Sequence, residues 1–361
     1  MQRAIRWVWT AGLAMAGVLA MAGPASAQRV EGDRAAAEGA YSAEVPVRSQ
    51  TESERNAGFA RALSQVFGKL SGDRSASARP GVGQELRRAK DYVEGYDYRQ
   101  DEGVGPSGAP SYTTTLIVRF RQKDVDETVA ALGLPVWPQP RPKPVLWLAI
   151  DDGKGPRLVG LAQNNVAKPL TQRAIERGYR LGLPGGSAAE QAAVGAIWRG
   201  DSAAIARLSA RYSPPMQLIG KLYRSKGGWK ADWIFVDGGR VLSTWSGEEL
   251  DARRVMAAGA DGAADALTRK YARRSAAGPT GPQRILFTGI DSSEDFIRLS
   301  GYLQGVSVVR RITPVRATPE GLEVELDLLT GMAGFRRMID EDVLVEQEGP
   351  VDTVVPVFRL R

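Results

Sequence analysis

Two stretches rich in proline and glycine divide the chain and constrain its fold more than any other feature. The first is GLPVWPQPRPKP, residues 133–144, and the second is RRSAAGPTGPQ, residues 273–283. Proline and glycine disrupt the interiors of helices and sheets, so both stretches are predicted to be loops or linkers. A chain of this length is expected to form two or three domains. We therefore predict three modules, at residues 28–134, 145–273 and 283–361.

The N-terminal residues have the pattern of a secretory signal peptide. A short basic stretch, MQRAIR, precedes the apolar run WVWTAGLAMAGVLAMAG, and small residues follow in PASA. This pattern predicts a leader at residues 1–27, cleaved between Ala27 and Gln28. An uncleaved membrane anchor is the alternative, but the run is rich in glycine and alanine and shorter than the roughly 20 strongly apolar residues that span a bilayer. We expect an exported protein with no transmembrane segment after cleavage.

The charge of the mature chain is mildly positive. The net charge is +7, and the leader contributes Arg3 and Arg6 but no acidic residue, so removing it leaves +5. A balance this small permits contact with anionic lipid or polymer but does not favour nucleic acid. Export makes nucleic acid a still poorer partner.

The sequence contains no histidine and no cysteine. Histidine is the commonest general base and transition-metal ligand, and cysteine supplies thiolate nucleophiles and zinc ligands. A serine triad requires histidine, and the chain has no G-x-S-x-G motif. We therefore predict that the protein is not an enzyme and has no cofactor and no metal site.

The pattern of apolar residues predicts an α/β (α+β) protein built of small mixed sheets with covering helices. The first module reads β-α-α-β-β-α, with its long helix over residues 49–70 begun by a capping box of Ser49 and Glu52. The middle module opens with the buried strand PVLWLAI, continues with helices and an antiparallel meander, and ends with a helix near residues 250–273. The third module reads β-α-β-β-α-β, which is the ferredoxin-like order.

Two acidic residues, Asp151 and Asp152, directly follow the buried strand of the middle module. Ligands often bind at the carboxyl end of such a strand, where these carboxylates would suit magnesium or calcium. Asp-Gly is also ordinary turn chemistry, and no third acid follows at ligand spacing. The pair is a candidate ligand site, with a structural turn as the alternative.

Tryptophan side chains form a second candidate site in the same module. Trp229 and Trp233 share one face of a predicted strand because strand side chains alternate, and Trp245 lies on the next strand. Such a stripe suits stacking on a sugar polymer such as peptidoglycan. More often an aromatic stripe is the core beneath covering helices, and both readings stay open.

Several ordered blocks resemble a known family. YSAEVPVRSQTESERNAGFARALSQVFGKLSGD, YVEGYDYR, LIVRF and LGLPVWPQPRPKPVLWLAIDDG are similar to exported proteins of Gram-negative bacteria, catalogued as the "domain of unknown function" family numbered two thousand and sixty-six. The resemblance implies a periplasmic location. It brings no known activity, substrate or functional residue.

These features together predict a non-catalytic periplasmic protein that acts through its surfaces, as an assembly, accessory or protein-interaction factor of the cell envelope. The expected partners are other envelope proteins, with anionic lipid or peptidoglycan as further candidates. The alternative is a periplasmic ligand-binding protein or carboxylate-based enzyme that uses the middle module, with Asp151, Asp152 and the tryptophan stripe as its site.

Overall fold

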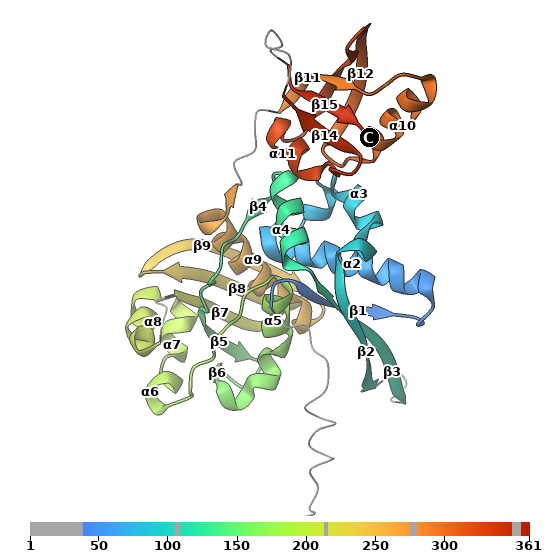
Figure 1. Cartoon of the computed structure of the whole chain (residues 1–361). Helices are drawn as coiled ribbons and strands as arrows, with labels where there is room; N and C mark the ends of the chain where they lie inside the picture. The colour runs from blue at the N-terminus through green and yellow to red at the C-terminus, as the bar shows by residue number, and fades with distance from the viewer. Residues whose placement is uncertain (1–38, 105–108, 213–215, 275–279, 349–354) are drawn as a thin grey trace, which may run out of the picture.

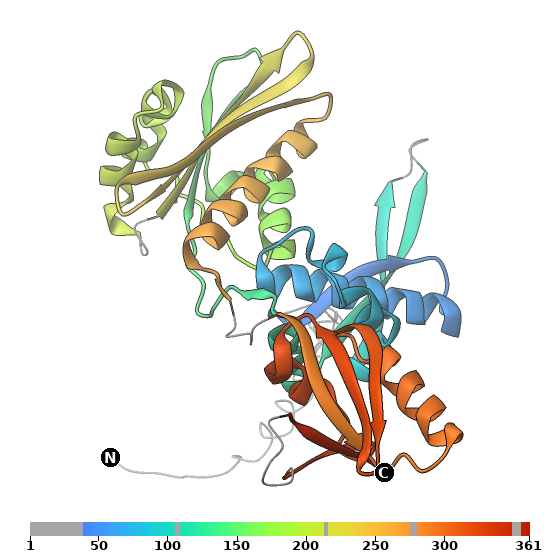
Figure 2. The ribbon, with the colours of Figure 1, turned by 90° about the horizontal axis from the view of Figure 1, so that it is seen from above.

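A computed structural model of the chain describes residues 39–104, 109–212, 216–274, 280–348 and 355–361. The predicted leader and its cleavage site at Ala27 and Gln28 lie outside these residues. The described residues form one three-stranded sheet, two five-stranded sheets and a short two-stranded ladder, with helices packed on them. The predicted α+β class is confirmed. In both views of the ribbon, the first module lies between the other two (Figures 1 and 2).

The first module has the predicted order of elements and an antiparallel sheet, β1-β3-β2. Its long helix begins at Glu52, with Thr51 as its N-cap, so the predicted capping box at Ser49 is wrong. The Ser49 hydroxyl instead lies 3.0 Å from that of Thr51. The elements are β1 (Ser42–Val47), α2 (Glu52–Ser71), α3 (Val82–Arg87), β2 (Val93–Val104), β3 (Pro110–Phe120), α4 (Gln122–Ala131) and β4 (Pro135–Val136).

The middle module has a sheet of order β6-β5-β7-β8-β9, in which only β5 and β7 are parallel. Alternate side chains of β5 enter two different hydrophobic clusters, one under α5 and α9 and one under α7 and α8. This confirms the predicted buried strand. The elements are β5 (Val145–Asp151), β6 (Arg157–Val159), α5 (Asn164–Glu176), α6 (Ala188–Gln191), α7 (Val194–Arg199), α8 (Ser202–Leu208), β7 (Met216–Ser225), β8 (Gly228–Asp237), β9 (Arg240–Glu249) and α9 (Ala252–Tyr271). β10 (Arg273–Arg274) then returns to pair with β4.

The third module follows the predicted ferredoxin-like order through its first five elements and then adds a strand. Its sheet has the order β12-β13-β11-β15-β14. The unexpected β14 forms the edge, so the last strand, β15, runs parallel to β11. The elements are β11 (Gly281–Thr288), α10 (Ser293–Gly305), β12 (Val309–Thr318), β13 (Gly321–Leu328), α11 (Gly331–Met338), β14 (Leu344–Gln347) and β15 (Val357–Leu360).

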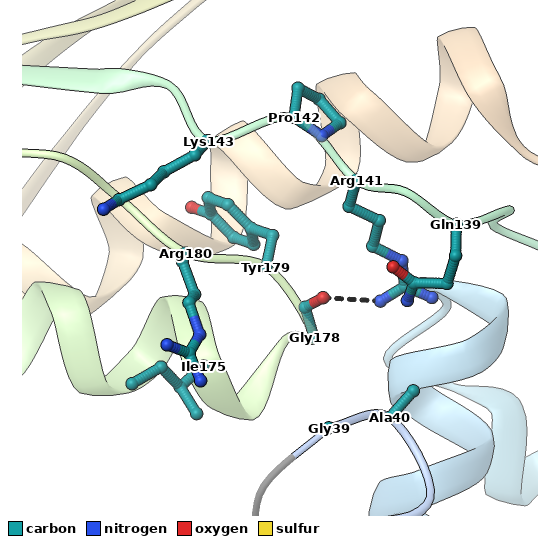
Figure 3. A pocket seen from close by; sticks show the side chains of 10 residues that line it. All are labelled: Gly39, Ala40, Gln139, Arg141, Pro142, Lys143, Ile175, Gly178, Tyr179 and Arg180. Atoms are coloured by element: carbon teal, nitrogen blue, oxygen red, sulfur yellow. Dashed lines mark hydrogen bonds between the residues drawn. The ribbon is translucent and has the colours of Figure 1, made fainter.

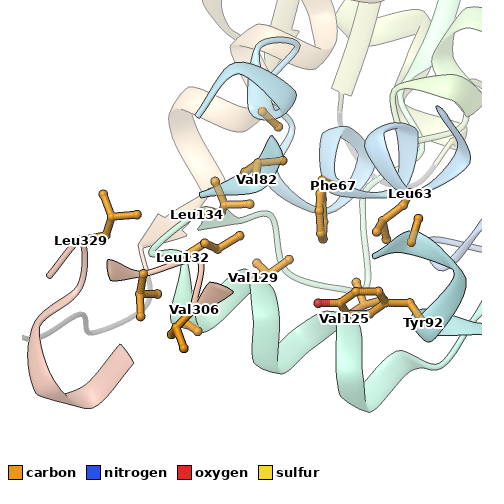
Figure 4. Close-up of a cluster of buried hydrophobic side chains, with 14 of the residues drawn as sticks. Leu63, Phe67, Val82, Tyr92, Val125, Val129, Leu132, Leu134, Val306 and Leu329 are labelled. Carbon is orange, nitrogen blue, oxygen red and sulfur yellow. The ribbon is translucent and has the colours of Figure 1, made fainter. Parts of the chain in front are cut away.

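The first and third modules share one hydrophobic cluster. Val82, Leu132 and Leu134 of the first module lie beside Val306 and Leu329 of the third (Figure 4). Across the same contact, the Thr330 hydroxyl donates to the carbonyl of Ala131 at 2.5 Å. Burial of this apolar surface fixes the two modules against each other.

Within the described part of the chain, no helix is both long and apolar enough to cross a membrane.

Candidate functional site

The two acidic candidates lie in a turn after β5. Asp151 Oδ1 accepts hydrogen bonds from the backbone N–H groups of Gly153, at 2.8 Å, and Gly155, at 3.1 Å. Asp152 forms a bidentate ion pair with Arg157, with both N–O distances 2.9 Å, and these hydrogen bonds hold the pKa of Asp152 well below its usual range. Among the described residues, no group of three metal-ligating side chains is close enough to hold an ion. These contacts are those of a structural turn.

The tryptophan stripe lies between the middle sheet and α9. Trp233 is 1% exposed, and its ring occupies the space above Gly220 of β7 and Gly259 of α9. Trp245 stacks on it, with ring centroids 6.5 Å apart, and lies against Gly262 of α9. The two helix glycines, three residues apart, let the rings approach the helix backbone, because any side chain there would collide with them. These contacts are those of a core.

Trp229 lies nearer the surface of the same face. It is half-buried, and the guanidinium of Arg224 lies 4.1 Å from its ring centroid. The structure therefore brings Trp233 and Trp245 together and leaves Trp229 at the margin. A ligand role for these side chains stays a prediction.

The close contact of Trp233 with Gly220 gives a first testable prediction. A Cβ atom at Gly220 would lie 2.1 Å from Trp233 Cζ3, so Gly220→Ala is expected to lower the free energy of unfolding by about 1–3 kcal/mol through overpacking. Gly247 is the matched control, because it also lies in a strand of this sheet and a Cβ there meets nothing within 4 Å. Urea unfolding of both variants checks this, and equal effects would contradict it.

The C-terminal ends of α2 and α5 meet at the junction between the first and middle modules. Helix C-termini carry unpaired carbonyls and partial negative charge, which cations stabilise. Arg141, from the proline-rich linker, donates to the carbonyl of Gly178, just after α5, at 2.6 Å, and to that of Trp137 at 2.9 Å. Its guanidinium also lies 4.2 Å from the Trp137 ring centroid. Burial lowers the pKa of Arg141 to about 10.

Arg177 joins three helices at this junction. It follows α5, and its side chain is 6% exposed. Its guanidinium donates to Asp261 at 2.8 Å and to Asp265 at 2.7 Å, both on α9, and to the carbonyl of Gly72 at the end of α2 at 2.8 Å. Arg173, one turn earlier, also donates to Asp261, at 3.0 Å. A single buried cation thus connects the middle module to the first.

A first cavity, of about 350 Å³, lies beside Arg141. The described residues that line it include three cations, Arg141, Lys143 and Arg180, and no acid. In Figure 3, Arg141 lies on one side of Tyr179, and Lys143 and Arg180 lie on the other. We call it the cationic cavity.

A second cavity, of about 310 Å³, shares the side chain of Ile175 with the first. The first module supplies Glu44, Gln65, Lys69 and Arg99, and α5 supplies Gln172, Ile175 and Glu176. We call it the Lys69 cavity. Lys69 is 4% exposed, and its ammonium donates to the carbonyl of Ser42 at 2.7 Å. Burial lowers the pKa of Lys69 to about 8, against the opposing effect of Glu44 and Glu176.

The lowered pKa of Lys69 predicts a specific dependence of stability on pH. Unfolded Lys69 keeps its proton up to a pKa of about 10.4, whereas folded Lys69 loses it near 8. Between these values the unfolded state binds more protons, so this group makes stability rise with pH, by about 2 kcal/mol from pH 8 to pH 10. Urea unfolding across this range should show the rise in the wild type and lose it in Lys69→Met. Parallel curves for the two proteins would contradict it.

Sequence reasoning missed Lys69, Arg141 and Arg177. Lys69 carried one local signal, because it falls three residues after Val66 on the apolar side of a predicted helix. Arg141 and Arg177 carried none, because their partners come from other segments.

The comparisons with known proteins give one match, to part of the chain, and this match corrects the resemblance drawn from the sequence. A family model described as a domain of unknown function, DUF8605, matches residues 35–138. The family numbered two thousand and sixty-six is therefore wrong. No curated protein and no solved structure matches the chain. The match covers less than half of the chain, so it shows similarity to a domain of unknown function over most of the first module and no more.

Proposed function

We propose that this protein is an exported, non-catalytic accessory factor of the cell envelope that binds its partners at the junction between the first and middle modules. The observation that carries the proposal is the composition of the two junction cavities. Each takes part of its wall from residues before the linker and part from α5 or the residues just after it. Binding sites occur preferentially at such interfaces between domains.

The contacts of the junction support a binding role rather than a hinge. Arg177 and Arg141 hold α2, α5 and α9 in one arrangement through hydrogen bonds to both modules. A surface composed of two modules is preorganised when their relative position is fixed, and preorganisation lowers the entropic cost of binding. The junction therefore presents a ready-made surface to a partner.

The alternative, a carboxylate-based site in the middle module, has less support. Asp152 is engaged by Arg157, and Asp151 accepts two backbone hydrogen bonds. Trp233 is covered by α9. A ligand would have to displace these contacts, and that displacement costs binding energy.

Site-specific crosslinking tests the proposal. A photoreactive residue at Ile175, which is 40% exposed between the two cavities, is expected to capture one defined envelope protein in cells. Leu161 is the matched control, because it is also in the middle module and 60% exposed but lines neither cavity. Capture at both positions alike, or at neither, would contradict the proposal. So would turnover of an envelope substrate that is lost when one acidic side chain is neutralised.

A further inference from the structure

We infer that the Lys69 cavity binds a small ligand that carries one carboxylate and an amide or amine, such as the end of a peptide, with Lys69 holding the carboxylate. This inference rests on the function proposed above, because it names the ligand class of one of the two junction cavities.

Lys69 is a buried cation whose ammonium has a backbone carbonyl as its partner and no carboxylate among the described residues. Its side chain is 4% exposed, and the Ser42 carbonyl is the partner of its ammonium at 2.7 Å. Within the part of the chain that the structure describes, Lys69 forms no ion pair, whereas Arg99 across the cavity pairs with Glu44 at 2.6 Å. An ammonium has three donors, and a buried charge without a counterion is costly. A ligand carboxylate at this position would supply both the acceptor and the charge.

The charges and amide groups of the other lining side chains indicate which class of ligand fits the cavity. The lining of the cavity contains two cations, Lys69 and Arg99, and two acids, Glu44 and Glu176, so its formal charges cancel. A doubly charged phosphate would meet repulsion from both acids, whereas a single carboxylate with an amine would match both signs. Gln65 and Gln172 add amide groups that donate and accept hydrogen bonds, which suits a peptide bond.

The volume of the cavity limits the number of heavy atoms that a ligand can have. About 310 Å³ holds about ten waters, at about 30 Å³ each. A dipeptide has a similar number of heavy atoms, so the cavity accepts one or two residues and not a folded partner.

Calorimetry with the dipeptide alanyl-alanine tests the inference on the mature protein. Wild type is expected to bind it, and Lys69→Met, which is one atom shorter and carries no charge, is expected to lose about tenfold or more in affinity. Lys168→Met is the matched control, because Lys168 is an exposed lysine of α5 that lines neither junction cavity, and the affinity of this variant should be unchanged. At pH 8, close to the lowered pKa of Lys69, part of the free protein has an uncharged Lys69. The carboxylate of the dipeptide favours the charged ammonium, so binding should take up protons.

A second variant guards against a folding defect in Lys69→Met. Gln172→Ala changes an exposed side chain of α5 and is expected to weaken binding severalfold while leaving thermal unfolding unchanged. No binding of the dipeptide to wild type would overturn the inference, as would equal binding to Lys69→Met or tighter binding of inorganic phosphate. Crosslinking at Ile175 without dipeptide binding would overturn this inference alone and leave the proposed function standing.

Discussion

Replacing Arg177 with alanine is expected to lower the free energy of unfolding by about 3 kcal/mol, because it leaves two partly buried carboxylates and a helix-end carbonyl without their shared, buried donor. Asp261 and Asp265 would keep Arg173 and Arg74 as nearby cations, which limits the loss. The Gly72 carbonyl would lose its bond to the middle module. Urea unfolding followed by tryptophan fluorescence measures the effect, since every tryptophan after Trp9 lies between Trp137 and Trp245.

The control for this prediction is Arg180→Ala. Arg180 lies three residues away, is exposed, and forms no ion pair among the residues that the structure describes, so its loss should change stability by less than about 0.5 kcal/mol. Arg177→Lys should fall between the two, because an ammonium is a point charge that cannot match the planar fork of a guanidinium. If Arg177→Ala and Arg180→Ala unfold alike, the junction is not held by Arg177.

Trp233→Ala is expected to have the largest effect, a loss of about 4 kcal/mol in the free energy of unfolding. The ring fills the space between β7 and α9 where both backbones carry glycine, so no neighbouring side chain at Gly220 or Gly259 can move into the vacated volume. The penalty for truncation grows with the cavity that remains. Urea unfolding monitored by circular dichroism avoids relying on the fluorophore that is removed.

Trp229→Ala is the matched control for Trp233→Ala. The two residues share a strand and a face, but Trp229 is half-buried and packs against Arg224 at the margin of the module. Its loss should cost about 1 kcal/mol, because water and neighbouring side chains can fill the space. If these side chains instead stack on sugars, Trp229→Ala and Trp245→Ala should lower the affinity for peptidoglycan fragments. The free energy of unfolding should then change little. Equal destabilisation by both truncations would contradict the core assignment of Trp233.

Local patterns in the sequence predicted the elements of the fold well. The apolar run at residues 144–150 predicted a buried strand, and β5 is buried on both faces. The glycine-bearing connections predicted the β7-β8-β9 meander. β14 was missed because it is four residues long and half of its side chains are exposed, so it shows little of the apolar pattern that marks a strand.

The sequence by itself determined the order of most helices and strands and the lack of imidazole and thiol, because each depends on residue types or on spacings within one turn or strand. Only the tertiary structure decided that α2 and α5 meet end to end, that a buried Lys69 faces a cavity, and that the first and third modules share a core. The physical reason is distance along the chain. Arg177 and Gly72 are 105 residues apart, and no local periodicity records a contact made by packing one finished element against another.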